Sequence, residues 1–98
     1  MTVSTHVLDS TVGRPATAVG VRLECAGDTV ATGRTDADGR IPALPTPLEG
    51  VYRLVFDLDG RSGFYPEVVI TFRVSDPAAH YHVPLLLSPF AYSTYRGS

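Results

Sequence analysis

Apolar and polar side chains alternate along most of this chain, and that period of two constrains the fold more than any other feature. Val21, Leu23 and Cys25 fall on one side of the chain, and the residues between them are charged. Residues 51–56 and 68–73 alternate in the same way. Side chains of a β-strand alternate between two faces of a sheet, and no window here repeats its apolar residues with a helical period. The pattern therefore predicts an all-β protein.

Glycine, proline and aspartate interrupt the alternating segments at the spacing typical of turns. Ala26-Gly27-Asp28 predicts a hairpin connection, and Asp38-Gly39 supplies the positive φ angles of a tight turn. Three prolines in residues 41–50 predict that any strand there is short and lies at a sheet edge. We expect one domain, residues 1–98, that folds as a β-sandwich or barrel. Its seven or eight short strands are predicted near 21–25, 29–35, 41–50, 50–56, 64–74, 80–87 and 90–95.

The composition excludes several classes of partner. The formal net charge is −2, and all eight basic residues are arginines spread along the chain, so no basic patch predicts binding to nucleic acid or an anionic membrane. No apolar run has the length of a membrane span, and the N-terminus lacks the features of a signal peptide. Cys25 is the only cysteine, so no intrachain disulfide can form, and its alternating context favours a small core residue over a nucleophile. We therefore expect a cytoplasmic protein.

Three histidines are the side chains best suited to acid–base chemistry. His80 and His82 are two apart on a predicted strand, so both face one side and Tyr81 faces the other. Imidazoles at this spacing can share a metal ion with His6 as a third ligand, but nothing in the sequence brings His6 near, and no metal is expected. Together with Arg40 and the polar C-terminus, the histidines suggest an anion-binding site with one or two general acid–base groups. Spacing alone does not decide whether these residues meet.

Five segments form a recognisable series: S-T-H-V-L-D (4–9), G-R-T-D-A-D-G-R (33–40), F-Y-P-E-V (64–68), H-Y-H-V-P-L-L-L-S-P (80–89) and Y-S-T-Y-R-G-S (92–98). In this order they resemble the 5-hydroxyisourate hydrolases, the transthyretin-like enzymes of urate degradation. The resemblance covers essentially the whole chain. The terminal Y-R-G-S is its most specific part, because it distinguishes these hydrolases from transthyretin.

The resemblance implies a transthyretin (prealbumin)-like β-sandwich, with the short helix of many relatives reduced or absent here. It also implies a homotetramer with active sites at the dimer–dimer interface. Such an assembly suits a chain of 98 residues, which has room for one core but little for an internal cavity. The implied reaction is hydrolysis of 5-hydroxyisourate to 2-oxo-4-hydroxy-4-carboxy-5-ureidoimidazoline, without a metal or organic cofactor.

Carried over motif by motif, the resemblance assigns both catalysis and substrate binding to particular residues. Catalysis is assigned to His6, Arg40, His82 and Ser98. Substrate binding is assigned to Arg40, Tyr95, Arg96, Gly97 and Ser98. The choice between the two histidines as general base stays open. His80 is expected to be a surface neighbour, and Arg96 is expected to hold the terminus more than to touch substrate.

Two other classes of function remain as alternatives. A transthyretin-like carrier would hold a small aromatic ligand in the same channel without turning it over. Such a carrier has no need to keep His6, Arg40, His82 and the terminal Y-R-G-S together. A structural or adhesive sandwich module would be expected with linkers or disulfides, and neither is present. The combined residue set therefore favours the hydrolase.

Overall fold

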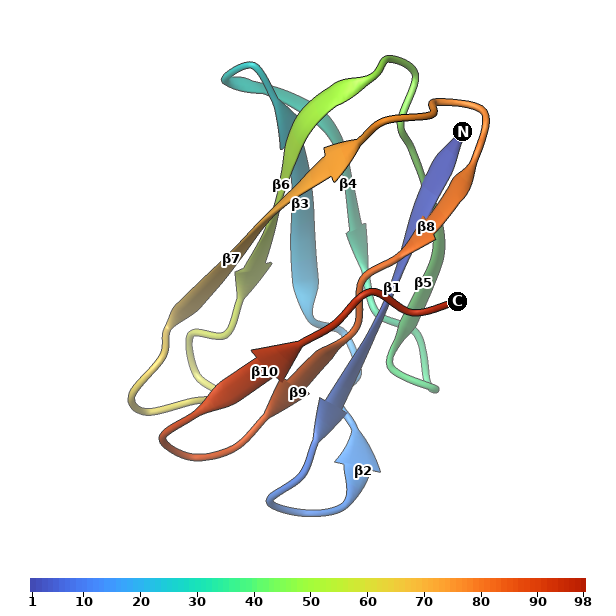
Figure 1. The fold of residues 1–98 in the computed structure, drawn as a ribbon. Helices are drawn as coiled ribbons and strands as arrows, with labels where there is room; N and C mark the ends of the chain where they lie inside the picture. The colour runs from blue at the N-terminus through green and yellow to red at the C-terminus, as the bar shows by residue number, and fades with distance from the viewer.

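The computed structural model describes residues 1–98 as two β-sheets packed face to face, so the all-β prediction is confirmed (Figure 1). The chain contains no helix, and hence none with the length and apolarity needed to cross a membrane. One sheet has four antiparallel strands in the order β4–β3–β6–β7. Their bounds are Gly20–Cys25 for β3, Asp28–Arg34 for β4, Gly50–Asp57 for β6 and Glu67–Val74 for β7.

The other sheet has six strands and is built around β1 (Thr2–Asp9). β1 pairs antiparallel with β5 and β2 along one edge, and parallel with β8 and β9 along the other. β10 extends the sheet beyond β9. The bounds are Arg14–Pro15 for β2, Arg40–Pro45 for β5, His80–His82 for β8, Leu85–Leu87 for β9 and Tyr92–Thr94 for β10. Residues from both ends and from the middle of the chain thus become neighbours of one central strand.

The inward faces of the two sheets form one hydrophobic core. In the four-stranded sheet the predicted alternation is confirmed, with Phe56 and its alternate neighbours completely buried. β1 turns Val3, Thr5 and Val7 inward. The buried Thr5 hydroxyl donates a hydrogen bond of 2.7 Å to the Val83 carbonyl, which removes the cost of placing a polar group there. The alternate residues of β1 consequently face away from the core.

Three details of the strand assignment differ from the prediction. The structure has ten strands instead of seven or eight. The single strand predicted over residues 80–87 is wrong, because β8 and β9 are separated by Val83 and Pro84, and proline has no N–H to continue a hydrogen-bonded ladder. β1 was not among the predicted strands, because a serine, a histidine and the inward Thr5 obscure its alternation.

The predicted turns are present and explain the glycines that the sequence places there. Ala26 and Gly27 connect β3 and β4 with φ angles of 53° and 86°, the left-handed pair of a two-residue hairpin. Gly39 has φ 75°, and a Cβ at this position would lie 2.8 Å from the Cβ of Pro15, so the turn before β5 accepts only glycine. β5 pairs with β1 alone, which confirms the prediction of a short edge strand in the proline-containing segment.

Candidate active site

The face of the six-stranded sheet that points away from the core carries much of the predicted site. Thr2, Ser4 and His6 alternate with the buried residues of β1 and lie on this face. The antiparallel register of β1 and β5 puts His6 opposite Arg40, and the parallel register of β1 and β8 puts Ser4 opposite His82. Strand pairing therefore brings three predicted residues onto adjacent strands. We call the surface formed by these five residues and His80 the histidine face.

His6 is held by the turn that precedes β5. Its Nε2 lies 2.8 Å from the carbonyl oxygen of Asp38. A carbonyl oxygen can only accept, so Nε2 carries a proton and donates it. The other ring nitrogen, Nδ1, has no hydrogen-bond partner within the chain. In the neutral ring Nδ1 is therefore a free acceptor on the open face of the sheet.

Asp36 closes the turn that carries Arg40. Its carboxylate Oδ1 accepts hydrogen bonds of 2.9 Å from the backbone N–H groups of both Asp38 and Arg40. The bond from the Arg40 backbone is the main cause that lowers the pKa of Asp36 from its ordinary value of 3.8, and the charges of Arg40 and His6 act in the same direction. Asp36 thus fixes the turn that supplies both the carbonyl that binds His6 and the strand residue that carries the guanidinium.

His82 is half-buried, and its protonated form is disfavoured. Its Nδ1 lies 2.7 Å from the Ser4 hydroxyl, and its Nε2 has no hydrogen-bond partner within the chain. Burial is the main cause that lowers the pKa of His82 from 6.5, and the positive charges of Arg40, His6 and His80 lower it further, against an opposing backbone hydrogen bond at Ser4. At neutral pH this side chain is an uncharged imidazole with one ring nitrogen free.

The C-terminus passes directly over His82, and Figure 1 shows the end of the chain beside β8 and β1. The Gly97 N–H donates a 2.9 Å hydrogen bond to the His82 carbonyl. A Cβ on Gly97 would lie 3.1 Å from Cγ of His82 and closer still to Cδ2, so only glycine allows the chain to approach the ring this closely. Ser98 follows immediately after this contact.

Tyr95 and Arg96 lie toward a different part of the molecule. The Arg96 guanidinium stacks on the ring of the buried Tyr81, with Cζ 5.0 Å from the ring centroid. Both residues line a hollow of about 290 Å³ together with Ile70 and Phe72 of β7. Within one chain their side chains therefore lie at the edge between the two sheets and not with the histidines. The stacking on Tyr81 ties the last residues to the core.

Comparison with known protein families identifies the relatives of this chain: the model of the HIUase/transthyretin family matches residues 3–97. The chain belongs to this family. Its relatives include the 5-hydroxyisourate hydrolases of Salmonella dublin, Caulobacter vibrioides and Mus musculus, which are 44%, 44% and 40% identical. Each match covers 97% of this chain, and they cover 79%, 96% and 93% of the respective relatives. The resemblance predicted from the five motifs is confirmed.

Solved structures of the HIUase/transthyretin family share the sandwich. Klebsiella pneumoniae 5-hydroxyisourate hydrolase superposes with a TM-score of 0.89 at 39% identity and covers 100% of both chains. Sea bream transthyretin, solved in complex with thyroxine, superposes with a TM-score of 0.83 at 33% identity and covers 97% of this chain and 93% of that one. The predicted transthyretin-like fold is confirmed. Because the fold serves both an enzyme and a ligand-binding protein, function has to be argued from the side chains.

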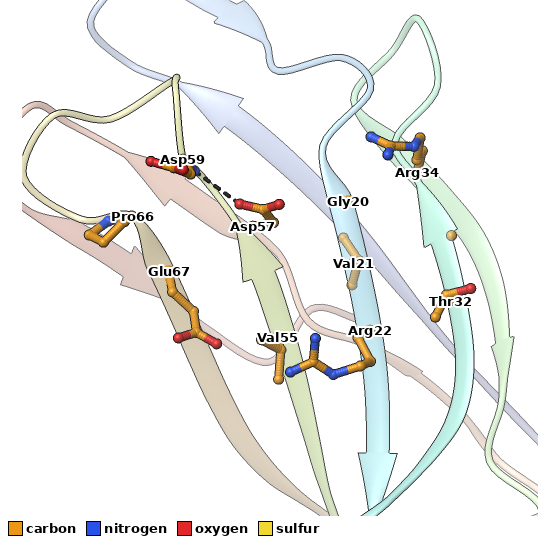
Figure 2. Close-up of a pocket in the computed structure, with 11 residues that line it drawn as sticks. Gly20, Val21, Arg22, Thr32, Arg34, Val55, Asp57, Asp59, Pro66 and Glu67 are labelled. Carbon is orange, nitrogen blue, oxygen red and sulfur yellow. Dashed lines mark hydrogen bonds between the residues drawn. The ribbon is translucent and has the colours of Figure 1, made fainter.

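A roomier hollow of about 700 Å³ lies on the outer face of the four-stranded sheet (Figure 2). Figure 2 shows Arg22 and Val55 on neighbouring strands, with Asp57 and Glu67 also lining the hollow. It contains charges of both signs and no histidine. None of the residues to which the resemblance assigns catalysis or substrate binding lines it, so we place the chemistry at the histidine face.

Sequence reasoning missed two residues that organise the histidine face, Ser4 and Asp36. Ser4 lies two residues before His6 on β1, and this spacing alone could have placed both side chains on one face. Asp36 lies in a D-x-D-G turn, a context in which aspartate commonly accepts backbone hydrogen bonds.

No three His, Cys, Asp or Glu side chains in the chain are grouped as metal ligands would be.

Proposed function

We propose that this chain catalyses the hydrolysis of 5-hydroxyisourate to 2-oxo-4-hydroxy-4-carboxy-5-ureidoimidazoline, without a metal or organic cofactor. The observation that carries the proposal is the histidine face. There, His6 and His82 each keep one ring nitrogen free. His6 lies opposite Arg40 of β5, and His82 lies on β8, which pairs with the other edge of the same strand β1. The relatives named as 5-hydroxyisourate hydrolases support the same reaction.

Arg40 binds the substrate and stabilises the transition state. The substrate is a flat, oxygen-rich ring, and attack of water on its ring amide carbonyl puts negative charge on oxygen. A guanidinium is planar and permanently charged, so it can bind the carbonyl edge with two hydrogen bonds that strengthen as this charge develops. Asp36 supports this role by fixing the backbone of Arg40.

His82 is the general base. Its lowered pKa keeps it uncharged at neutral pH, and its free Nε2 can take a proton from the attacking water. The water oxygen then bonds to the ring carbonyl carbon, and the C–N bond of the ring breaks as the oxyanion collapses. The same proton passes from Nε2 to the leaving nitrogen, so His82 returns to its starting state. The proposal therefore takes His82 as the base, a choice between the two histidines that the sequence left open.

His6 and the C-terminus complete the proposed site. Nδ1 of His6, whose ring is oriented through Asp38, hydrogen-bonds the substrate beside Arg40. Gly97 lets the last residues lie on the His82 ring, and the Ser98 hydroxyl orients the attacking water there. Arg96 acts as a positioning residue through its stacking on Tyr81. Tyr95 is proposed to contact substrate only where a neighbouring subunit completes the site.

The active unit is proposed to be a homotetramer with sites at the dimer–dimer interface. The histidine face lies on the surface of a single chain, so it needs a second subunit to exclude water. Large apolar side chains also remain exposed near the sheet ends, with Phe90 at 76%, Val12 at 61% and Phe64 at 59% exposure. Such side chains are typical of a surface that a partner covers. Multi-angle light scattering tests this, and a fully active monomer would contradict the shared site.

A cytoplasmic location is proposed on the cysteine content. Cys25 is the only cysteine and is a free thiol that packs against the core. Small secreted domains are more often held by disulfides. Fractionation of the native host with antibody detection measures the location directly.

The experiment that tests the activity is an ultraviolet time course of 5-hydroxyisourate, generated in place from urate by urate oxidase. The wild-type chain should accelerate the decay, and His82→Asn should lose most of that acceleration with an unchanged circular dichroism spectrum. Phe90→Ser removes an exposed apolar side chain outside the histidine face. Measured in the same assay, it tests whether activity depends on the proposed assembly. Decay at the spontaneous rate in the presence of folded wild-type protein would refute the hydrolase and leave a transthyretin-like carrier as the better account.

A further inference from the structure

A chain of hydrogen bonds connects His82 to an exposed imidazole that the proposed mechanism does not use. The Ser4 hydroxyl lies 2.7 Å from Nδ1 of His82 and 2.9 Å from Nε2 of His80. Nδ1 of His80 lies 2.5 Å from the Thr2 hydroxyl. All four residues lie on the histidine face, two from β1 and two from β8. The chain runs from the half-buried His82 to the exposed His80.

We propose that Ser4 and His80 form a proton relay behind His82, with Ser4 as a positioning residue and His80 as the proton outlet to solvent. The inference rests on the proposed hydrolase function and deepens it. In the resting state Nδ1 of His82 donates to Ser4, and the Ser4 hydroxyl donates to Nε2 of His80. Nδ1 of His80 in turn donates to Thr2. A serine hydroxyl donates one bond and accepts others, so every donor in this arrangement has an acceptor.

The relay moves one positive charge by two coupled proton transfers and leaves all heavy atoms in place. After Nε2 of His82 takes a proton from water, the ring is an imidazolium. Its Nδ1 proton moves to the Ser4 oxygen, while the Ser4 hydroxyl proton moves to Nε2 of His80. His82 is then neutral again with its proton on Nε2, ready to protonate the leaving nitrogen, and the positive charge is on His80. His80 can exchange its proton with buffer, and it returns one proton through Ser4 to Nδ1 of His82 as Nε2 protonates the leaving nitrogen, so His82 ends in its starting state.

Electrostatics favour moving the charge outward. The charged or titratable groups around His82 are Arg40 from β5, His6 from β1 and His80 on β8 itself. A second positive charge beside Arg40 is costly at a half-buried position, whereas an exposed imidazolium is hydrated. Transfer to His80 moves the new charge away from Arg40 along the strands, because Arg40 pairs with His6 while His82 pairs with Ser4 and His80 with Thr2.

The test compares kcat in weak and strong buffers for variants of the full chain. Ser4→Ala and His80→Gln should each lower kcat about tenfold in weak buffer, with little change in KM. This is smaller than the full contribution of acid–base catalysis, because His82 itself is retained. Added imidazole should restore the rate, since it accepts the proton directly. Ser4→Thr keeps the hydroxyl and should retain activity. Ser75→Ala is the matched control, because Ser75 is exposed and its side chain makes no hydrogen bond.

Two results would overturn the relay: wild-type kcat for both variants in weak buffer, or a lowered kcat that imidazole does not restore. A ring-nitrogen NMR titration of His82 supplies a readout without turnover. His80→Gln removes a positive neighbour and should raise the pKa of His82. An unchanged titration would refute the coupling even if the variants are slow. If wild-type protein itself fails to accelerate substrate decay, the proposed function falls, and this titration still decides whether the two imidazoles are coupled.

Discussion

Gly97 offers the sharpest test of how the C-terminus serves the histidine face. Its φ is not in the left-handed region, so an added methyl group in Gly97→Ala acts through space and not through backbone strain. The new Cβ would lie 3.1 Å from Cγ and 3.2 Å from Cβ of His82. Its closest approach is to Cδ2, and there the ring or the terminus has to move by roughly 1 Å to restore ordinary carbon–carbon contact at about 3.5 Å.

The expected effects on activity and on stability differ in size. A displacement of this kind in a reacting group can cost about 100-fold in rate, so kcat/KM should fall by about that factor. The free energy of unfolding should change by only about 1 kcal/mol, because the terminal segment can lift at the expense of one hydrogen bond to His82. For a domain of this size that is roughly 4–8 °C in Tm.

The assay is the urate oxidase-coupled decay of 5-hydroxyisourate together with thermal unfolding. Gly63→Ala is the matched control, since its added Cβ would meet no atom within 4 Å and its φ is ordinary. Gly63→Ala should leave both kcat/KM and Tm unchanged. Wild-type activity in Gly97→Ala would refute the close contact between the terminus and His82. A loss of activity that merely follows global unfolding would refute the argument that the contact acts on catalysis.

Three further predictions follow from pKa shifts and turn geometry. Burial and neighbouring charges lower the pKa of His82, so kcat/KM should stay level as the pH falls through 6.5 and decline only below it; a decline already above 6.5 would exclude His82 as the base. Asp36→Ala should slow turnover and lower Tm. The folded-state pKa of Asp36 is depressed, so its contribution to the free energy of unfolding is present above pH 3.8 and is lost as the pH falls through the folded-state pKa. The Tm values of wild type and variant should therefore converge in acid. Ala26→Asn should raise the free energy of unfolding by roughly 0.5–1 kcal/mol in urea titration, since asparagine tolerates the left-handed φ of 53° better than alanine does.

The strands predicted best are those whose alternation is unbroken. β3, β6 and β7 each bury one apolar face, and a period of two is enough to identify that face. β1 escaped the prediction because its inward positions include Thr5, whose polarity is compensated only by the Val83 carbonyl, 78 residues away. The break after β8 was readable from Pro84, since proline cannot donate to a ladder.

The site shows a different limit of sequence reasoning. The motifs identified His6, Arg40 and His82 by resemblance, but their proximity depends on which strands pair and in which register. Residue types alone do not predict which distant strands pair or in which register. The same holds for Ser4, whose hydroxyl contacts imidazoles that are 76 and 78 residues further along the chain.

Tyr81 explains why these registers are secure. It lies between His80 and His82, and its ring is buried in the core under the Arg96 guanidinium. Its hydroxyl accepts hydrogen bonds from the backbone N–H groups of Ser75 and Asp76. A slip of β8 by one residue would expose this ring, break those bonds and bury two imidazoles, so the packing of Tyr81 penalises every register that turns the histidines inward. The core residue between them therefore holds both imidazoles on the outer face, where chemistry can use them.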